Sequence, residues 1–114
     1  MRLAERVIKR AVKIDDEPLT IDDIMDKVCS HYNVTMSAVN SRSRKKDIVM
    51  ARQVSMYMAQ KYTKMPASRI GKLVGNRDHS TVIHSCSKIE DRLKVDKGFH
   101  AEIASIENSF KLKA

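Results

Sequence analysis

The stretch from Gly75 to Lys88 combines a helix end, a helix start and a polar first turn, and it constrains the fold more than any other part of the chain. Gly75 readily takes the left-handed conformation that closes a helix, Asn76 also suits a turn, and Asp78 is a favoured N-cap residue. The first turn of the next helix should then contain His79, Ser80 and Thr81. Their short polar side chains suit base edges in a DNA groove better than a protein core.

Apolar residues recur behind this polar turn at helical spacing, so the new helix has a side that can pack. They are Val82, Ile83, Cys86 and Ile89. A shorter helix should precede the turn, because Pro66 suits the first position of a helix and Gly75 ends one. Its inward residues should be Ile70, Leu73 and Val74. A short helix, a tight turn and a second helix with a polar start predict a helix-turn-helix.

Positive charge is concentrated in the middle of the chain. The 114 residues carry a formal net charge of +8 at pH 7. Between Asn40 and Arg77 there are ten Lys or Arg and one acid, Asp47, so this segment holds the whole excess. Such a surface fits a polyanion, most often a nucleic acid, because neutralising phosphates releases their counterions. For a charge run considered by itself, a solvated basic face is the alternative.

Composition favours a single all-α domain. The chain has three Gly, two Pro and no Trp but seven Met, and its 114 residues are a usual domain size. Cys29 and Cys86 lie among apolar residues at helical positions, which favours buried thiols over a disulfide or metal site, and a reducing cytoplasm. Charges interrupt the N-terminus and no apolar run reaches membrane-spanning length, so we expect a soluble chain.

Before the basic segment, the sequence predicts two helices separated by a break. An amphipathic pattern spans Leu3 to Lys13, and the acidic, proline-containing run from Asp15 to Leu19 interrupts it. Thr20 is suited to cap a second helix that ends at Asn33. The apolar stripe of this second helix is Ile21, Ile24, Met25, Val28, Cys29 and Tyr32.

A basic loop and a long core helix should follow. Thr35 is expected to cap a short turn through Val39, and residues 40–46 then offer no apolar side chain to bury. This pattern predicts an exposed loop suited to a phosphate backbone or a narrow minor groove, with a mobile surface loop as the alternative. Asp47 is expected to cap a helix over residues 48–63. The apolar face of that helix is Met50, Ala51, Val54, Tyr57, Met58 and Tyr62.

The C-terminal part of the chain predicts two more long segments of helix. The second helix of the helix-turn-helix should run to about Leu93. A final helix from Phe99 to about Leu112 should cover the open side of the bundle through Phe99, Ile103, Ile106 and Phe110.

The residues do not favour catalysis or metal binding. Gly71 and Gly75 are not followed by the Gly-Lys-Ser or Gly-Lys-Thr of a phosphate-binding P-loop. The four histidines lack a zinc-site spacing with the two cysteines, so no metal is expected. Asp78, His79 and Ser80 match the residue types of a catalytic triad, but neighbours on one helical turn point in different directions. The sequence therefore predicts a chain that is not an enzyme.

The run from Arg77 to His84 closely resembles the signature of the C-terminal DNA-binding domain, domain IV, of the DnaA family of bacterial chromosomal replication initiators. The similarity continues without gaps through Ile70-Gly71 and Ala51-Arg52-Gln53 to Ser41-Arg42-Ser43-Arg44, and it covers roughly residues 19–93. It implies a Trp-repressor-like helical domain that binds double-stranded DNA at the short DnaA boxes of a replication origin.

The resemblance also implies site residues by position. Base contacts in the major groove would come from Asp78, His79, Ser80 and Thr81, while Arg44 would enter the adjacent minor groove. Contacts with the DNA backbone would come from Arg42, Lys45, Lys46, Arg52, Gln53, Arg77 and Lys88. The chain departs from the family pattern at Asn76, where a second Gly is usual, and at Ser80, where Thr is common. Ser80 lacks the methyl group that could touch a thymine methyl, so base preference should differ there.

The resemblance implies further parts outside this chain. An ATPase domain would precede residue 1, with residues 1–18 as a connecting helix and linker and residues 19–114 as the DNA-binding domain. ATP and magnesium would belong to the ATPase domain, so no cofactor is expected in this chain. Self-assembly would use the other domains, which leaves this fragment monomeric. The expected location is the bacterial cytoplasm, in association with the nucleoid.

Other functions stay open from the residues. A transcription regulator or a nucleoid-type DNA binder of the same fold could use the same motif, and selecting preferred sequences from random duplexes would distinguish it from an origin binder. A protein-interaction bundle whose basic face meets an acidic partner predicts little affinity for DNA. A hydrolase built on His79 is the least favoured function.

Overall fold

A computed structural model describes residues 19–113, with side chains up to residue 110. Every regular element in this part is an α-helix, which confirms the predicted all-α class. The helices are α2 (Ile21–Tyr32), α3 (Met36–Val39), α4 (Lys46–Tyr62), α5 (Ala67–Leu73), α6 (His79–Val95) and α7 (Lys97–Lys113). The helix predicted over Leu3 to Lys13, and the break that follows it, lie outside the described residues apart from Leu19.

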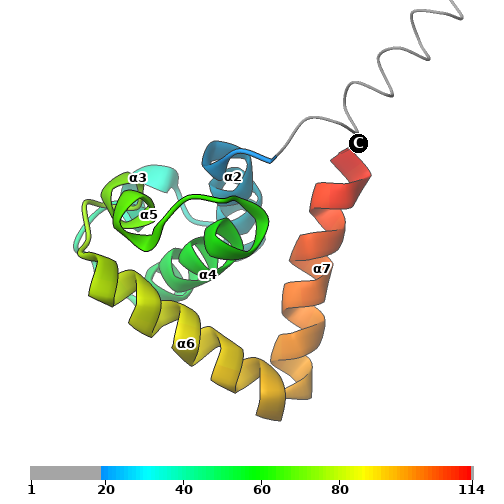
Figure 1. Ribbon diagram of the computed structural model, residues 1–114. Coiled ribbons are helices and arrows are strands. Elements are labelled where there is room, and N and C mark those ends of the chain that lie inside the picture. The colour runs from blue at the N-terminus through cyan, green and yellow to red at the C-terminus, as the bar shows by residue number, and fades with distance from the viewer. Residues whose placement is uncertain (1–18, 114) are drawn as a thin grey trace, which may run out of the picture.

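Helix α4 is the centre of the domain. It is contacted by α2, α3, α5 and α6, while α7 packs on α2 and α6. Figure 1 shows α6 crossing one side of the bundle and α7 returning beside it, so that the two longest peripheral helices form an open V. The short helix α5 and the start of α6 lie at the opposite end of the bundle from the corner between α6 and α7. None of the helices between residues 19 and 113 is long and apolar enough to cross a membrane.

The predicted caps of the first two helices are confirmed. The hydroxyl of Thr20 accepts a hydrogen bond from the backbone N–H of Asp23 at 3.1 Å and so satisfies one free donor at the start of α2. Asn33 ends the same helix in the left-handed conformation, with φ 57°. Thr35 caps α3 by accepting from the N–H of Ala38 at 3.0 Å. These local bonds explain where the chain turns before it enters α4.

Four helix boundaries differ from the predictions. Helix α4 begins at Lys46 with Lys45 at its N-cap position. Asp47 therefore lies in the first turn, where its negative charge interacts favourably with the positive end of the helix dipole. Pro66 occupies the N-cap of α5 rather than its first helical position. Helix α6 continues to Val95 and α7 already begins at Lys97. Asp96 makes this tight corner, because its carboxylate accepts from the N–H of Phe99 at 2.9 Å.

The core largely follows the predicted apolar stripes, with three exceptions. Leu73 and Ile83, both predicted to face inward, are 41% and 52% exposed. Met56, which falls outside the predicted face of α4, is completely buried. Ile83 lies outside because α6 packs through Val82, Cys86 and Ile89, which occupy a narrower strip of its surface. The predicted burial of both cysteines is confirmed.

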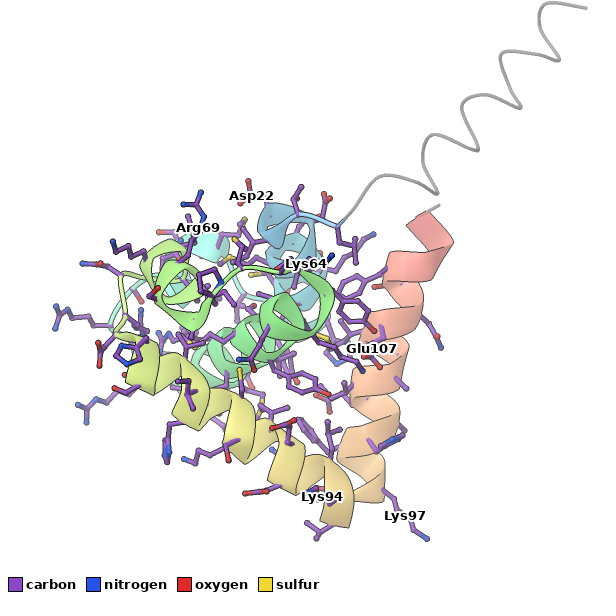
Figure 2. All side chains as sticks on the ribbon, in the orientation of Figure 1. Asp22, Lys64, Arg69, Lys94, Lys97 and Glu107 are labelled. Carbon is purple, nitrogen blue, oxygen red and sulfur yellow. The ribbon has the colours of Figure 1, made fainter. Side chains whose placement is uncertain are left out.

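Polar and aromatic side chains, which we call the α7 seam, join α7 to the rest of the domain. The hydroxyl of Tyr32 donates to Glu102, and that of Tyr62 donates to Glu107 at 2.7 Å. The ammonium of Lys61 lies 2.6 Å from the same Glu107 carboxylate, and Figure 2 shows Glu107 on the side of α7 that faces the bundle. The α7 seam consists of Tyr32, Lys61, Tyr62, Glu102, Glu107 and Phe110.

Candidate nucleic-acid interface

The turn between α5 and α6 has the backbone conformation that its sequence predicts. Gly75 and Asn76 both take positive φ angles, of 79° and 55°, and the chain then extends to Asp78 at the N-cap of α6. A side chain at position 75 would also have its Cβ only 2.9 Å from the carbonyl oxygen of Asn40. Glycine therefore satisfies two requirements here, the left-handed backbone and the close approach of the loop before α4.

Gly71 sets the distance between the two helices of the motif. The backbone N–H of Arg77 donates to the carbonyl oxygen of Gly71 at 2.6 Å, across the turn. A Cβ at position 71 would lie 2.1 Å from the carbonyl oxygen of Arg77 and 3.2 Å from the side chain of Val82. This close contact at Gly71 was not predicted from the sequence. A glycine inside a short helix was the available indication of a close backbone contact.

The first turn of α6 exposes all four residues predicted to contact bases, Asp78, His79, Ser80 and Thr81. The Ser80 hydroxyl donates to the Asp78 carboxylate, and Nδ1 of His79 lies 3.5 Å from the other carboxylate oxygen. The Ser80 hydroxyl lowers the pKa of Asp78, so this carboxylate is an anion and a hydrogen-bond acceptor at neutral pH. Asp78 holds the N-cap position as predicted, but its side chain bonds Ser80 and makes no capping bond to the helix backbone.

The basic loop, which we define as residues 40–45, has a shape fixed by its own serines. The Ser41 hydroxyl donates to the carbonyl of Ala38 at 2.5 Å and accepts from the N–H of Ser43 at 3.1 Å. The Ser43 hydroxyl accepts from the N–H of Lys45 at 3.3 Å. As predicted, the charged side chains at this end are exposed, namely Arg42, Arg44, Lys45 and Lys46. Short serine bonds thus shape the backbone while the cations face outward.

The guanidinium groups of two arginines donate hydrogen bonds to backbone carbonyls of this loop and of the residues next to it. Arg52 of α4 is only 8% exposed, and its guanidinium donates to the carbonyls of Val39, Ser41 and Ser43 at 2.9, 2.9 and 3.0 Å. Arg77 donates to the same Ser41 carbonyl at 2.7 Å. It also donates to the carbonyls of Val74 and Gly75, at 3.1 and 3.0 Å. We call this set of bonds the arginine–carbonyl clasp.

The resemblance implied contacts with the DNA backbone for Arg52 and Arg77, and in the structure both guanidinium groups donate to carbonyls of the protein itself. Burial lowers the pKa of both guanidinium groups, and each is further lowered by a neighbouring arginine. Carbonyl oxygens satisfy the donors without neutralising the charge. The sequence could not distinguish a phosphate contact from a carbonyl contact, because an arginine near the start of a helix suits both.

A surface hollow lies where the basic loop meets the turn of the motif. It is lined by Arg42, Gly75, Asn76 and Arg77. Lys88 is exposed farther along α6, and Gln53 is half-buried on α4. The Ser41 carbonyl accepts from both Arg52 and Arg77 and so fixes the basic loop beside the turn that precedes α6. Within the described residues, no group of three or more His, Cys, Asp or Glu side chains is placed to hold a metal ion.

Residues 21–89 match a family described as the bacterial dnaA protein helix-turn-helix. This range contains the basic loop, the clasp and the polar turn of α6, and it accounts for more than half of the chain. The matched region is a helix-turn-helix, which agrees with the geometry of α5, the turn and α6.

The chain is also similar to part of each of several bacterial replication initiators. The chain is 44% identical over 112 residues to chromosomal replication initiator protein DnaA of Bacteroides thetaiotaomicron, which covers 98% of the chain and 24% of that protein. It is 44% identical over 105 residues to the protein of that name from Streptococcus thermophilus, covering 90% and 23%. For Porphyromonas gingivalis the identity is 34% over 107 residues, covering 94% and 23%. The chain thus spans about a quarter of the length of these relatives.

Proposed function

We propose, because the chain belongs to the DnaA family of bacterial chromosomal replication initiators, that it binds double-stranded DNA at DnaA boxes of a replication origin. The part of that family that the chain matches is its helix-turn-helix. We further propose that residues 19–114 form the DNA-binding domain and that residues 1–18 connect it to an ATPase domain. ATP and magnesium would act there, and self-assembly would use those other parts.

The proposal rests on one backbone atom that links the basic loop to the turn before the exposed start of α6. The carbonyl oxygen of Ser41 accepts from Arg52 and from Arg77, so the basic loop is fixed to the turn that precedes α6. A duplex presents its major and minor grooves side by side, and a helix with an adjoining arm can enter both. The arrangement suits reading both grooves with one small domain.

In this proposal the first turn of α6 enters the major groove. His79, Ser80 and Thr81 can donate to or accept from base edges, and Asp78 can accept from an exocyclic amine such as that of cytosine. Arg44, exposed in the basic loop, would enter the adjacent minor groove, where a narrow groove attracts arginine. Ser80 already donates to Asp78, so the two side chains would act as a pair.

Contacts with the phosphate backbone would come from the exposed cations around these groups. Arg42, Lys45 and Lys46 are exposed on the basic loop and the start of α4, and Lys88 is exposed on α6. Gln53 could donate from α4 to a phosphate. Such contacts fix the register of the domain, while the base contacts set its sequence preference.

The test is fluorescence anisotropy with a labelled duplex carrying a consensus DnaA box, a one-base variant and a scrambled duplex, each over a series of salt concentrations. His79→Ala should weaken binding to the box by about 1–3 kcal/mol and reduce the preference for it over the scramble. Lys45→Ala should weaken all three duplexes alike and reduce the slope of log K against log salt by about 0.9.

Lys94→Ala is the matched control for lost charge. Lys94 is an exposed cation on the same helix, but it lies at the corner with α7, far from the turn of the motif (Figure 2). Its substitution should leave both the affinity and the salt slope close to those of the unchanged chain. Equal binding of the box and the scramble at moderate salt would contradict the proposal. A preferred sequence unrelated to the box, selected from random duplexes, would favour a transcription regulator or nucleoid-type binder.

A further inference from the structure

The arginine–carbonyl clasp joins three segments that are far apart in the sequence. Arg52 lies on α4, Arg77 lies before α6, and both donate to the carbonyl of Ser41 in the basic loop, at 2.9 and 2.7 Å. Together the two side chains donate to five carbonyls, which belong to Val39, Ser41, Ser43, Val74 and Gly75. Two of these acceptors lie in the basic loop, one ends α3 just before it, and two lie in the turn before α6.

Loss of these bonds would free the loop rather than remove a surface contact. The loop between α3 and α4 has no apolar side chain of its own to bury, so its position depends on hydrogen bonds. Arg52 supplies two of them from inside the domain and also bonds the carbonyl of Val39 at the end of α3. An 8% exposed guanidinium with its donors directed at loop carbonyls is placed to support a backbone, not to reach outward to a phosphate.

We propose that Arg52 and Arg77 are positioning residues that hold the basic loop at a fixed place relative to the first turn of α6, and so set the spacing between the minor-groove and major-groove contacts. This proposal rests on the proposed function. A loop that is already ordered loses less conformational entropy when DNA binds, so the bonds increase affinity without touching DNA.

The choice of carbonyl acceptors has a second effect, on charge. A carboxylate partner would hold an arginine equally well but would cancel its charge. Carbonyls leave both charges in place, and one of them, that of Arg77, lies near Arg42 and lines the same hollow. These charges add to the local positive potential at the surface, which favours the approach of a polyanion. The clasp therefore orders the loop and keeps it positive.

The decisive variant is Arg52→Lys, which keeps the charge but cannot make the forked set of bonds to three carbonyls. We expect it to weaken binding to the box about 10-fold or more, as for loss of several hydrogen bonds, while the salt slope stays that of the unchanged chain. In the free protein, amide hydrogen exchange of Ser43 and Lys45 should become faster, since their backbone loses its support.

Lys46→Gln is the matched control, since Lys46 is an exposed cation next to the same loop. It should reduce the salt slope by about 0.9 and leave amide exchange in the loop unchanged. Arg52→Gln completes the set. If Arg52 instead contacted a phosphate, Arg52→Lys would bind normally, Arg52→Gln would behave like Lys46→Gln, and exchange in the loop would not change. That pattern would overturn the proposal.

Arg77→Lys gives an independent test from the other side of Ser41, and it decides the question if Arg52→Lys does not fold. It should show the same loss of affinity for the box, at an unchanged salt slope, with faster exchange at Ser43. Unchanged exchange in both folded variants would refute the clasp. The exchange measurement needs no DNA, so faster exchange combined with equal binding of box and scramble would instead uphold the clasp and contradict the proposed function.

Discussion

The clasp and the α7 seam both fix a peripheral segment to the domain, but they treat positive charge in opposite ways. In the clasp, Arg52 and Arg77 donate to neutral carbonyls. In the α7 seam, Lys61 lies against the carboxylate of Glu107, which also accepts from Tyr62. The first arrangement keeps its positive charge beside the proposed DNA surface. The second cancels charge where a helix only needs to be attached.

The comparison also separates two sources of stability. The Lys61–Glu107 pair is partly exposed, and pairs of that kind contribute at most about 1 kcal/mol. Apolar contacts, such as the edge-to-face packing of Tyr62 on Phe110, supply the rest of the attachment of α7. The clasp has fewer apolar contacts to rely on, since the loop that it holds buries little. The backbone conformation of the turn should therefore be more sensitive to substitution than the position of α7 in the seam.

The largest effect is expected at Gly71, on the clasp side. Gly71→Ala should destabilise the domain by about 3 kcal/mol, because a Cβ there would lie 2.1 Å from the carbonyl of Arg77 and push the turn away from α5. Urea unfolding followed by circular dichroism measures the change. Gly98→Ala is the control in α7, where a Cβ would meet only the Asp96 carboxylate at 3.4 Å, and it should be neutral or stabilising. An equal loss of unfolding free energy in Gly71→Ala and Gly98→Ala would show that the turn is no more sensitive to substitution than α7.

A smaller effect should distinguish the two sides of α6, the helix that follows the turn and packs on α7. Val82→Ala should cost about 2 kcal/mol, because Val82 is completely buried against the core. Ile83→Ala should cost less than about 0.5 kcal/mol, because that side chain is half exposed. The same unfolding measurement compares them. A larger loss for Ile83 would mean that α6 packs through Ile83 rather than through Val82.

Alkaline pH should weaken the α7 seam but not the clasp. Burial, and then the hydrogen bond to Glu107, raise the pKa of Tyr62 to about 12, above the value near 10 of an unfolded tyrosine. The stabilisation from the protonated phenol is therefore complete below pH 10 and is lost as pH rises towards 12. After allowance for the exposure of this side chain, the loss should be about 1 kcal/mol. The clasp should be unaffected, because a guanidinium keeps its proton in proteins even where burial lowers its pKa.

The expectation is tested by comparing the pH dependence of stability in Tyr62→Phe with that in the unchanged chain. The variant should lose less stability than the unchanged chain between pH 10 and pH 12. Cys86 also titrates there, since burial raises the pKa of its thiol to about 11, but it is present in both proteins and cancels in the comparison. Parallel stability curves for the two proteins would show that the Tyr62 hydroxyl does not couple pH to the seam.

The smallest effect is expected at Asn76, the second left-handed residue of the turn. Asn76→Gly should change the free energy of unfolding by less than about 0.5 kcal/mol, because asparagine already tolerates this conformation. Asn76→Ala should cost about 1 kcal/mol, since alanine lacks that tolerance. Asn33→Gly, at the left-handed end of α2, serves as the control away from the DNA surface. A large gain from Asn76→Gly alone would show that the turn is strained by its asparagine.

Local chemistry made the turns and caps predictable. Thr20, Asn33, Thr35 and Gly75 act through their own backbone and the next few residues, so the sequence is sufficient to place them. The polar, exposed start of α6 follows from the same kind of information. Helix boundaries were less accurate where a distant contact intervenes, as at Asp96, whose carboxylate allows α6 and α7 to follow each other almost directly.

Burial within a helix was harder to predict, because it depends on how many neighbours surround the helix. The prediction for α4 assumed one apolar face, but four helices contact it. Met56 and Arg52 are therefore buried although neither lies on the predicted stripe. Conversely, α6 meets fewer neighbours, so Ile83 on the edge of its predicted stripe is exposed. No property of the local sequence distinguishes these cases before the arrangement of the helices is known.

The acceptors of the clasp belong to the peptide backbone, and every amino acid has the same carbonyl group. Exchanging Arg42, Arg44 or Lys45 for other residues removes none of the bonds that Arg52 and Arg77 make with the loop. The residues that would recognise DNA can therefore change during evolution, or by design, on a support that stays intact. Altered recognition in such a domain does not require a new scaffold.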